Sequence, residues 1–410
     1  MMEVTKLNEI ASEAQKRLFL NYLDALIQKN TINSFGSSYY CDEKHVNESQ
    51  VDLEMNGELA TVFIRIISSE DGNLECIEYD TLSGDSCRGY IKELILKALM
   101  QALSSAKATF YRKYHYCYVG PQLDGEYWIK KMRIAPVHFE ENTKGWDNIE
   151  RYISIEFEVE AIDESDANAV GNKLADICAA RLSLLLNIGI YPPRNEHKWF
   201  LSEALNEPSI LRQTGFYGYG HQLKRMPRKK ELCKAGQLHK TVHPYLRYTG
   251  DVLKLPTETR KLFTSLEGAS DSIQRAFNQC CFLYQLALTA GRYYPTVELS
   301  YLVAAVEALA KSEPDKSNQH FSAFIRNYSC STNDVSHLTD FMHGSVRSAH
   351  FHSGEFIGGE YDHERMSTIH FSNVSQEKNE HYFRECRKLL RYSIANWVTM
   401  LIAYYSQGES

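Results

Sequence analysis

The 410-residue sequence lacks the features that would place it in a membrane or outside the cell. No apolar run reaches the roughly 18 residues that a membrane helix requires. The stretch that comes closest, 389–405, is interrupted by Arg391, Ser393 and Asn396. Residues 1–15 carry charges from Glu3 onward and contain no apolar core, so they do not predict a signal peptide. We therefore expect a cytoplasmic protein without a membrane partner.

Paired cysteines and a net positive charge are also missing. The ten cysteines form no CxxC pair and no zinc-ribbon spacing, which argues against a disulfide framework or a structural zinc site. The 45 Lys and Arg against 52 Asp and Glu give a net charge of −7, which excludes a broadly basic nucleic-acid coat protein. Common enzyme motifs such as GxxxxGK(S/T), GxSxG and HExxH do not occur. The sequence therefore predicts no metal and no cofactor.

What is present is the composition of an ordinary globular chain, 43% apolar and 24% charged, with a length typical of two or three domains. Residues 1–194 mix both kinds of pattern. Helical spacing covers 7–29, 88–105 and 164–187, a polar turn-like segment covers 33–38, and strand patterns cover 59–67, 74–79, 108–119 and 152–160. These residues predict an α+β domain that acts as a sensor or regulator.

The clearest strand pattern is 152–160. Its apolar residues alternate with polar ones: Ile153, Ile155, Phe157 and Val159 against Ser154, Glu156, Glu158 and Glu160. Because side chains alternate between the two faces of a strand, this pattern predicts one buried face and one solvated face. Residues 70–73 (Glu-Asp-Gly-Asn) predict the turn of a hairpin between the strands at 59–67 and 74–79.

Residues 195–250 predict a basic, aromatic connector. Between 212 and 247 there are nine Lys or Arg and one acid, a local charge of +8 against −15 for the rest of the chain. The basic run is Lys224, Arg225, Arg228, Lys229, Lys230 and Lys234, and it follows the segment Gly215-Phe-Tyr-Gly-Tyr-Gly220. Such a segment is most often a solvated connector, but this one also suits RNA binding by phosphate contacts and base stacking.

From 251 to 410 the pattern is helical. Apolar stripes with 3.6-residue periodicity lie near 273–287, 296–311, 333–350 and 378–405. Amphipathic helices with moderate connections predict an all-α bundle. The sequence thus indicates an α+β N-terminal domain at 1–194 and a helical bundle at 251–410.

The segment 341–355 carries the side chains best suited to chemistry. An arginine and a histidine are the groups that a metal-free ribonuclease needs. A neutral imidazole, with an ordinary pKa of about 6.5, can take a proton from a ribose 2′-OH, and a guanidinium can clamp a phosphate. Arg347 and His352 are five residues apart, which places them about 140° apart on an ideal α-helix, on different faces. Ser353 and Gly354 can end the helix at that point.

Arg347-Ser-Ala-His-Phe-His352 resembles the motif of the HEPN superfamily, an Arg and a His separated by four residues, in the form common to its Apea-like branch. Leu302-Val-Ala-Ala-Val-Glu307-Ala-Leu is similar to the apolar helix of that family, which carries a Glu-Ala-Leu signature. The resemblance covers about 255–405 and preserves the order of apolar helix, motif and last long helix. It implies a four- or five-helix HEPN-type bundle.

In function, the resemblance implies a metal-independent endoribonuclease that works as a homodimer, with the two Arg and His pairs in one composite cleft. His352 would act as general acid and base, and Arg347 would hold the scissile phosphate. The expected products carry 2′,3′-cyclic phosphate and 5′-hydroxyl ends. Many Apea-like proteins act in bacterial anti-phage defence, where RNA cleavage arrests the infected cell. In that setting we expect the N-terminal domain to sense a trigger, such as a phage-derived protein.

Three further residues are supporting candidates: His350 and Ser348 beside the motif, and Glu307 as a buried partner of Arg347. HEPN toxins that pair with a nucleotidyltransferase carry a Tyr two residues after the His. Here that position is Gly354, so regulation through such a Tyr is not expected.

Other interpretations stay open. Arg347 can be a surface residue, His352 a helix cap, and Glu307 a solvated edge residue. His343, His350, His352 and His363 match no zinc template. The bundle can be a non-catalytic HEPN-like module that binds a protein or a nucleotide, or a structural partner in a larger assembly.

Overall fold

The computed structural model describes residues 3–7, 10, 13–55, 58–70, 72–82, 85–104, 107–137, 150–162, 164–192, 200–201, 210–211, 236–238, 252–311, 320–329, 335–361 and 374–406. Two compact units form the chain. Unit 1 comprises Met1–Phe110 and Glu160–Ala169, and unit 2 comprises Tyr111–Val159 and Val170–Ser410. This division differs from the predicted border at 194, because most of the second sheet belongs with the helices of the C-terminal half.

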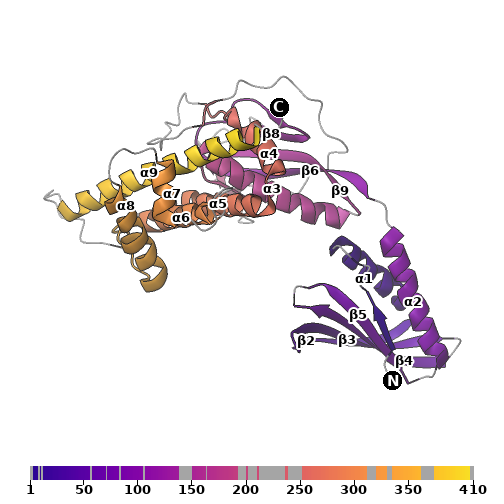
Figure 1. Ribbon diagram of the computed structural model, residues 1–410. Coiled ribbons are helices and arrows are strands. Elements are labelled where there is room, and N and C mark those ends of the chain that lie inside the picture. Colours follow the sequence, from indigo (N-terminus) through magenta and orange to yellow (C-terminus); the bar gives the residue numbers. More distant parts are fainter. Residues whose placement is uncertain are drawn as a thin grey trace. The chain divides into compact units, whose positions relative to one another are not determined.

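Unit 1 is an antiparallel sheet with two helices on one face (Figure 1). The strand order is β1 (Glu3–Lys6), β5 (Leu74–Thr81), β4 (Glu58–Ser69), β3 (Lys44–Met55) and β2 (Thr31–Cys41). Helices α1 (Glu13–Gln28) and α2 (Asp85–Ser104) bury apolar side chains against that face in a common core. The core includes Phe19 and Leu23 of α1, Leu53 and Ile77 of the sheet, and Ile91 of α2.

The hairpin predicted at 70–73 is confirmed. The amide of Gly72 donates to the carbonyl of Ser69, and Gly72 adopts a φ of 80°, a conformation that glycine tolerates without strain. The segment 33–38 is not the predicted turn, because it lies inside β2 and pairs with β3. As an edge strand with both faces largely exposed, β2 has no packing requirement that would exclude Ser, Asn and Gly. The predicted helix at 7–29 begins only at Glu13, since Leu7 is buried in the core.

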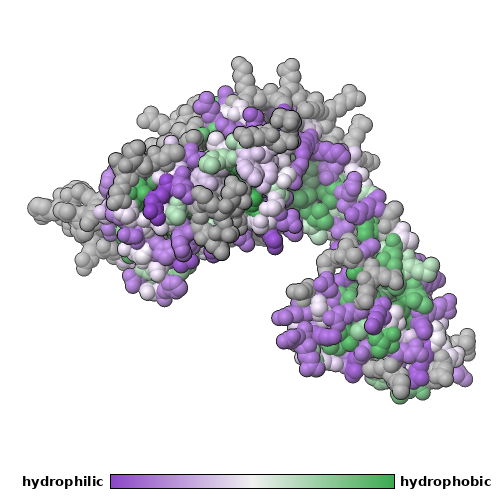
Figure 2. Space-filling model, viewed as in Figure 1, coloured by the Kyte–Doolittle hydropathy of each residue, from purple (hydrophilic) through white to green (hydrophobic). Residues whose placement is uncertain are grey.

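An apolar stripe marks the outer side of α2. Leu96, Met100 and Leu103 are 44%, 71% and 37% exposed, and their spacing places them on one side of the helix. Figure 2 shows apolar surface in this region of unit 1.

Unit 2 contains a second antiparallel sheet in the order β10 (Ile190–Tyr191), β6 (Ala108–Val119), β9 (Glu150–Ala161), β8 (Met132–Val137) and β7 (Tyr127–Ile129). Helix α3 (Glu164–Leu186) packs on it, and the hydroxyl of Tyr116 donates to Asp176 at 2.7 Å. The face of β9 predicted to be solvated is partly buried, because Ser154 and Glu156 are 2% and 0% exposed. Arg133 pairs with Glu156 at 2.7 Å and supplies the cation that a buried carboxylate requires.

The C-terminal half of unit 2 is helical (Figure 1). Its elements are α4 (Glu258–Gly268), α5 (Asp271–Thr289), η2 (Ala290–Tyr293), α6 (Pro295–Ala310), α7 (Phe321–Tyr328), α8 (Ser336–Asp340), η3 (Phe341–Ser353) and α9 (Val374–Ser406). The four predicted stripes correspond to α5, α6, α8 with η3, and α9, while α4 and α7 are additional. Phe277 of α5 stacks on Trp397 of α9, with 5.7 Å between ring centroids, at the centre of this core.

The polar residues that interrupt the apolar stretch 389–405 are buried and bonded. Arg391 is 1% exposed and donates to the carbonyls of Leu184 and Leu185 at the end of α3. Asn396 donates to the carbonyl of Tyr328 at 2.7 Å. The last carbonyls of a helix lack intrahelical partners, so Arg391 caps α3 and ties it to α9. Across the described ranges, no helix is both long and apolar enough to span a membrane.

Candidate functional site

The predicted motif lies on η3, which is a π-helix and is the ochre helix below the label α8 in Figure 1. In a π-helix the backbone hydrogen bonds join residue i to residue i+5, so residues five apart lie on the same side of the helix. Arg347 and His352 therefore share a face of η3, whereas an α-helix would place them on different faces. The expectation that the pair would be separated was wrong, since it assumed α-helical geometry.

Gly354 ends the helix, as predicted. It adopts the left-handed conformation with a φ of 69°, and its amide donates to the carbonyl of His350 at 3.0 Å. The amide of Glu355 donates to the carbonyl of Ala349 at 3.3 Å. These bonds satisfy carbonyls that the end of the helix leaves open and fix the last turn, which carries His352.

Arg347 is held where η3 packs against α6. Its guanidinium Nη2 lies 3.2 Å from Glu307 Oε2, so the pairing predicted from the sequence is present. The guanidinium carbon also lies 5.7 Å from the ring centroid of Phe351. Met342 and Val346 of η3 are fully buried. Arg347 Nε is buried and has no hydrogen-bond partner within the described ranges, so the arginine keeps one unused donor.

His343 is a member of the site that the sequence did not identify. Its Nε2 lies 3.4 Å from Glu307 Oε1, so the two oxygens of one carboxylate face an imidazole and a guanidinium. The sequence could have indicated His343 as a site residue, because it lies four residues before Arg347 on the same helix. Glu307 itself is only partly exposed, with 19% of its side chain accessible.

The remaining predicted residues differ in environment. His352 is exposed and has no hydrogen-bond or ionic partner among the residues that the structure describes, which leaves its imidazole open to a ligand. His350 is half-buried, packs against the rings of Phe351 and Phe356, and lies 3.4 Å from the carbonyl of Glu355. We therefore assign His350 a structural role. Ser348 is half-buried directly after Arg347.

The segment after η3 is fixed to the first turn of α6. Glu360 accepts hydrogen bonds from the amide of Thr296, at 2.5 Å, and from its hydroxyl, at 3.1 Å. The amide of Gly358 donates to the same hydroxyl at 2.8 Å. A carboxylate at a helix N-terminus satisfies open amides and complements the helix dipole. Residues 354–361 are thus held beside the motif helix.

The predicted RNA-binding residues Lys224, Arg225, Arg228, Lys229 and Lys230 lie outside the described residues, as does His363. Within the described part of the chain, no group of three His, Cys, Asp or Glu side chains is arranged to hold a metal ion.

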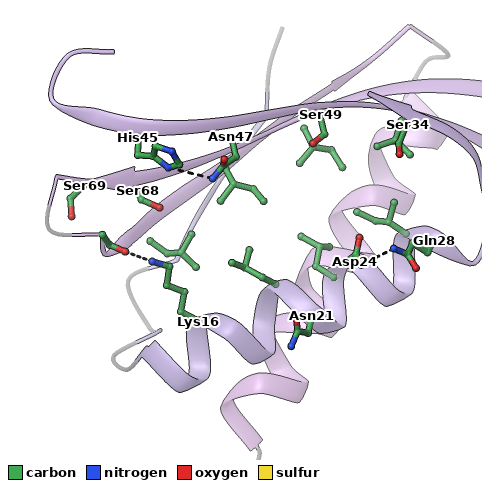
Figure 3. Close-up of a pocket in the computed structure, with 18 of the residues that line it drawn as sticks. Lys16, Asn21, Asp24, Gln28, Ser34, His45, Asn47, Ser49, Ser68 and Ser69 are labelled. Atoms are coloured by element: carbon green, nitrogen blue, oxygen red, sulfur yellow. Dashed lines mark hydrogen bonds between the residues drawn. The ribbon is translucent and has the colours of Figure 1, made fainter. Parts of the chain in front are cut away.

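Unit 1 contains a separate groove of about 650 Å³ between α1 and the sheet (Figure 3). The groove is lined by apolar side chains and, along β3, by His45, Asn47 and Ser49, which face α1 at every second position. Across the groove α1 presents Lys16, Asn21, Asp24 and Gln28. This groove was not predicted from the sequence, although polar residues at alternate positions ahead of Val51 and Leu53 were a usable signal.

Several polar groups of the groove already have hydrogen-bond partners within unit 1. Ser38 Oγ lies 2.7 Å from His45 Nε2, and Gln28 donates to Asp24 at 2.8 Å. Lys16 donates to the carbonyl of Gly72. The groove therefore presents hydrogen-bonding groups of mixed charge rather than a strongly charged surface.

Comparisons with protein-family models, with curated proteins and with solved structures found no match to this chain.

Proposed function

We propose that the chain is a metal-independent endoribonuclease of the HEPN type, with the helical half of unit 2 as its catalytic part. The observation that carries the proposal is the placement of Arg347 and His352 on one face of the π-helix η3. Arg347 is held by Glu307 and keeps 29% of its side chain accessible, and His352 is exposed. A fixed guanidinium and an accessible imidazole on one side of a helix are the groups that RNA cleavage without a metal requires.

In the proposed reaction, the imidazole of His352 accepts the proton of a ribose 2′-OH. The 2′ oxygen attacks the adjacent phosphorus, and the bond from phosphorus to the 5′ oxygen breaks. Arg347 stabilises the charge that develops on the phosphate oxygens. The leaving 5′ oxygen takes a proton from an imidazolium, which a homodimer supplies from its second copy. The products carry a 2′,3′-cyclic phosphate and a 5′-hydroxyl.

The direct test is cleavage of total RNA by the purified full chain in the presence of EDTA. We expect cleavage by the wild type and a loss of at least a hundredfold in Arg347→Ala and in His352→Ala. Arg384→Ala is the matched control, because Arg384 is an exposed arginine of α9 that contacts neither Arg347 nor Glu307. Mass spectrometry of the fragment ends checks for the cyclic phosphate. Equal cleavage by wild type and both variants overturns the assignment.

The second candidate is a non-catalytic HEPN-like module that binds RNA, a nucleotide or a protein. The observation in its favour is that Glu307 already compensates the charge of Arg347. RNA binding by the wild type without cleavage, and weaker binding by Arg347→Ala, would favour this module.

We assign recognition of the activating signal to unit 1, and the biological setting to anti-phage defence. The groove between α1 and the sheet supports this assignment, because it is open and carries hydrogen-bonding groups without a catalytic arrangement. Asn47→Leu, which fills the polar end of the groove, is expected to leave cleavage by unit 2 intact and to abolish protection of cells against phage. Protection that equals the wild type in Asn47→Leu cells contradicts a role for the groove.

A further inference from the structure

A continuous row of aromatic rings lies beside the proposed catalytic residues. The ring of His350 lies 5.3 Å from Phe351 and 5.0 Å from Phe356, measured between centroids. Phe356 lies 5.0 Å from Tyr361, and Tyr361 lies 6.3 Å from Tyr294. These five residues are called the aromatic row. It runs from η3 through the following segment to the start of α6.

Much of the aromatic row is accessible. Phe351, Tyr361 and Tyr294 are 44%, 58% and 39% exposed. Single exposed aromatic residues are common, but a contiguous group is typical of a binding surface. Phe356 meets Tyr361 at 89° and His350 at 77°. An edge-to-face contact uses the face of only one ring, whereas parallel stacking would use a face of both.

The row is held in place before any ligand binds. Phe356 and Tyr361 belong to the segment that Glu360 and Gly358 attach to Thr296 at the start of α6. Asn379 of α9 also donates to the carbonyl of Ile357 at 3.4 Å. A surface that is already ordered loses little conformational entropy when a ligand binds.

A guanidinium that is paired with Glu307 lies at one end of the row. The guanidinium of Arg347 is 5.7 Å from the ring of Phe351, and His352 follows Phe351 in the chain. Aromatic faces next to a cationic group bind single-stranded nucleic acid, because bases stack on the rings while the cation contacts a phosphate. A duplex keeps its bases stacked on one another and cannot offer them to the protein.

We infer that the aromatic row is a stacking subsite for the unpaired bases of single-stranded RNA, with the adjoining phosphate at Arg347. This inference rests on the proposed function and narrows its substrate to RNA with unpaired bases. Tyr361 is the principal stacking residue, because it is the most exposed member of the row.

The test measures binding by the full chain carrying His352→Ala, which prevents cleavage of the probe, in EDTA. The probe is a fluorescein-labelled single-stranded oligoribonucleotide followed by fluorescence anisotropy. We expect Tyr361→Ala to weaken binding by about tenfold, because stacking of one base on an aromatic ring contributes roughly 1–3 kcal/mol. Tyr361→Phe retains the ring and should bind like the parent. Phe351→Ala is a second variant, which should also lose affinity.

Tyr404→Ala is the matched control. Tyr404 is 51% exposed on α9, but it lies 22 residues beyond Tyr382, which contacts Phe341 at the start of η3. That separation corresponds to about 33 Å along a helix. Its removal should leave RNA binding unchanged, and circular dichroism checks that each variant is folded.

A probe with abasic positions separates stacking from phosphate contacts. Removal of the bases should weaken binding to the parent and have little further effect on Tyr361→Ala. Any of three results overturns the inference: the parent and Tyr361→Ala bind the intact probe with equal affinity, the parent binds duplex and single strand with equal affinity, or no RNA binding is found at all. If the native chain never cleaves RNA but the abasic effect is found, the stacking subsite stands and the ribonuclease proposal falls. If the native chain cleaves RNA but the abasic effect is absent, the ribonuclease proposal stands and the stacking subsite falls.

Discussion

The guanidinium of Arg347 and the carboxylate of Glu307 lie 3.2 Å apart where η3 packs against α6. This ion pair connects the motif helix to the helix whose first turn holds residues 354–361. Both partners are partly buried, so solvent screens their interaction less than it screens a surface pair. The pair therefore fixes the position of Arg347 before a phosphate arrives.

The energy of this pair is measurable in a double-mutant cycle. We expect Glu307→Gln and Arg347→Gln each to destabilise the chain, with a coupling free energy of roughly 1 kcal/mol between them in urea unfolding. Arg384 and Glu385 form the control pair on α9, 3.7 Å apart and more exposed, and should show almost no coupling. A coupling energy at 307 and 347 no larger than that of the control pair contradicts a positioning role for Glu307.

The end of the motif helix depends on one glycine. Gly354 has a φ of 69°, and a Cβ there would meet no atom within 4 Å, so a substitution introduces backbone strain without a clash. We expect Gly354→Ala to lower the free energy of unfolding by roughly 1–2 kcal/mol. Gly344 lies inside η3, also with open space around its Cβ, but without a positive φ. Gly344→Ala should raise stability by roughly 0.5–1 kcal/mol. Similar effects of both substitutions in urea unfolding would refute this account of Gly354.

The sequence identified most helices and strands because their apolar periodicity reflects one buried face. It also identified the hairpin at 70–73 and the end of η3 at Gly354, since both depend on the local conformation of glycine. The pairing of Arg347 with Glu307 was one of two interpretations of Glu307 that the sequence left open, based on the need of a buried carboxylate for a cation.

Features that depend on tertiary contacts were not predictable in this way. Burial of Glu156 depends on Arg133 of a neighbouring strand, which an alternating pattern cannot reveal. The π-helical form of η3 could not be predicted, because the apolar pattern of 333–350 fitted an α-helix equally well. Residues 33–38 look like a turn because an edge strand tolerates polar residues.

Two carboxylates should give opposite pH dependence of stability. Burial raises the pKa of Glu298 above its ordinary value of 4.5, and Arg387, at 2.7 Å, offsets only part of this effect. The folded state then holds the proton more tightly than the unfolded state. The contribution of Glu298 to stability is therefore complete below pH 4.5 and is lost as the pH rises through the raised pKa.

For Glu385, a hydrogen bond from Lys388 lowers the pKa of the carboxyl below 4.5, so its contribution is present above that pH and is lost as the pH falls. Urea unfolding between about pH 3 and pH 7 compares Glu298→Gln and Glu385→Gln with the wild type. The difference in stability from the wild type should change with pH in opposite directions for the two variants. Changes in the same direction would show that one of the two assignments is wrong.

The buried guanidinium of Arg391 should contribute more to stability than any surface arginine of α9. It donates to the carbonyls of Leu184 and Leu185, and its guanidinium carbon lies 5.6 Å from the ring centroid of Tyr284. Arg391→Leu removes these donors and leaves the carbonyl of Leu184 with only the amide of Asn187, at 3.4 Å, as a partner. We expect a loss of roughly 3 kcal/mol in the free energy of unfolding, because a hydrogen bond from a charged group contributes about 1.5–3 kcal/mol. Arg384→Leu, at an exposed position of the same helix, should change stability by less than about 0.5 kcal/mol. Equal midpoints of urea unfolding for these two variants would show that Arg391 does not fasten α9 to α3.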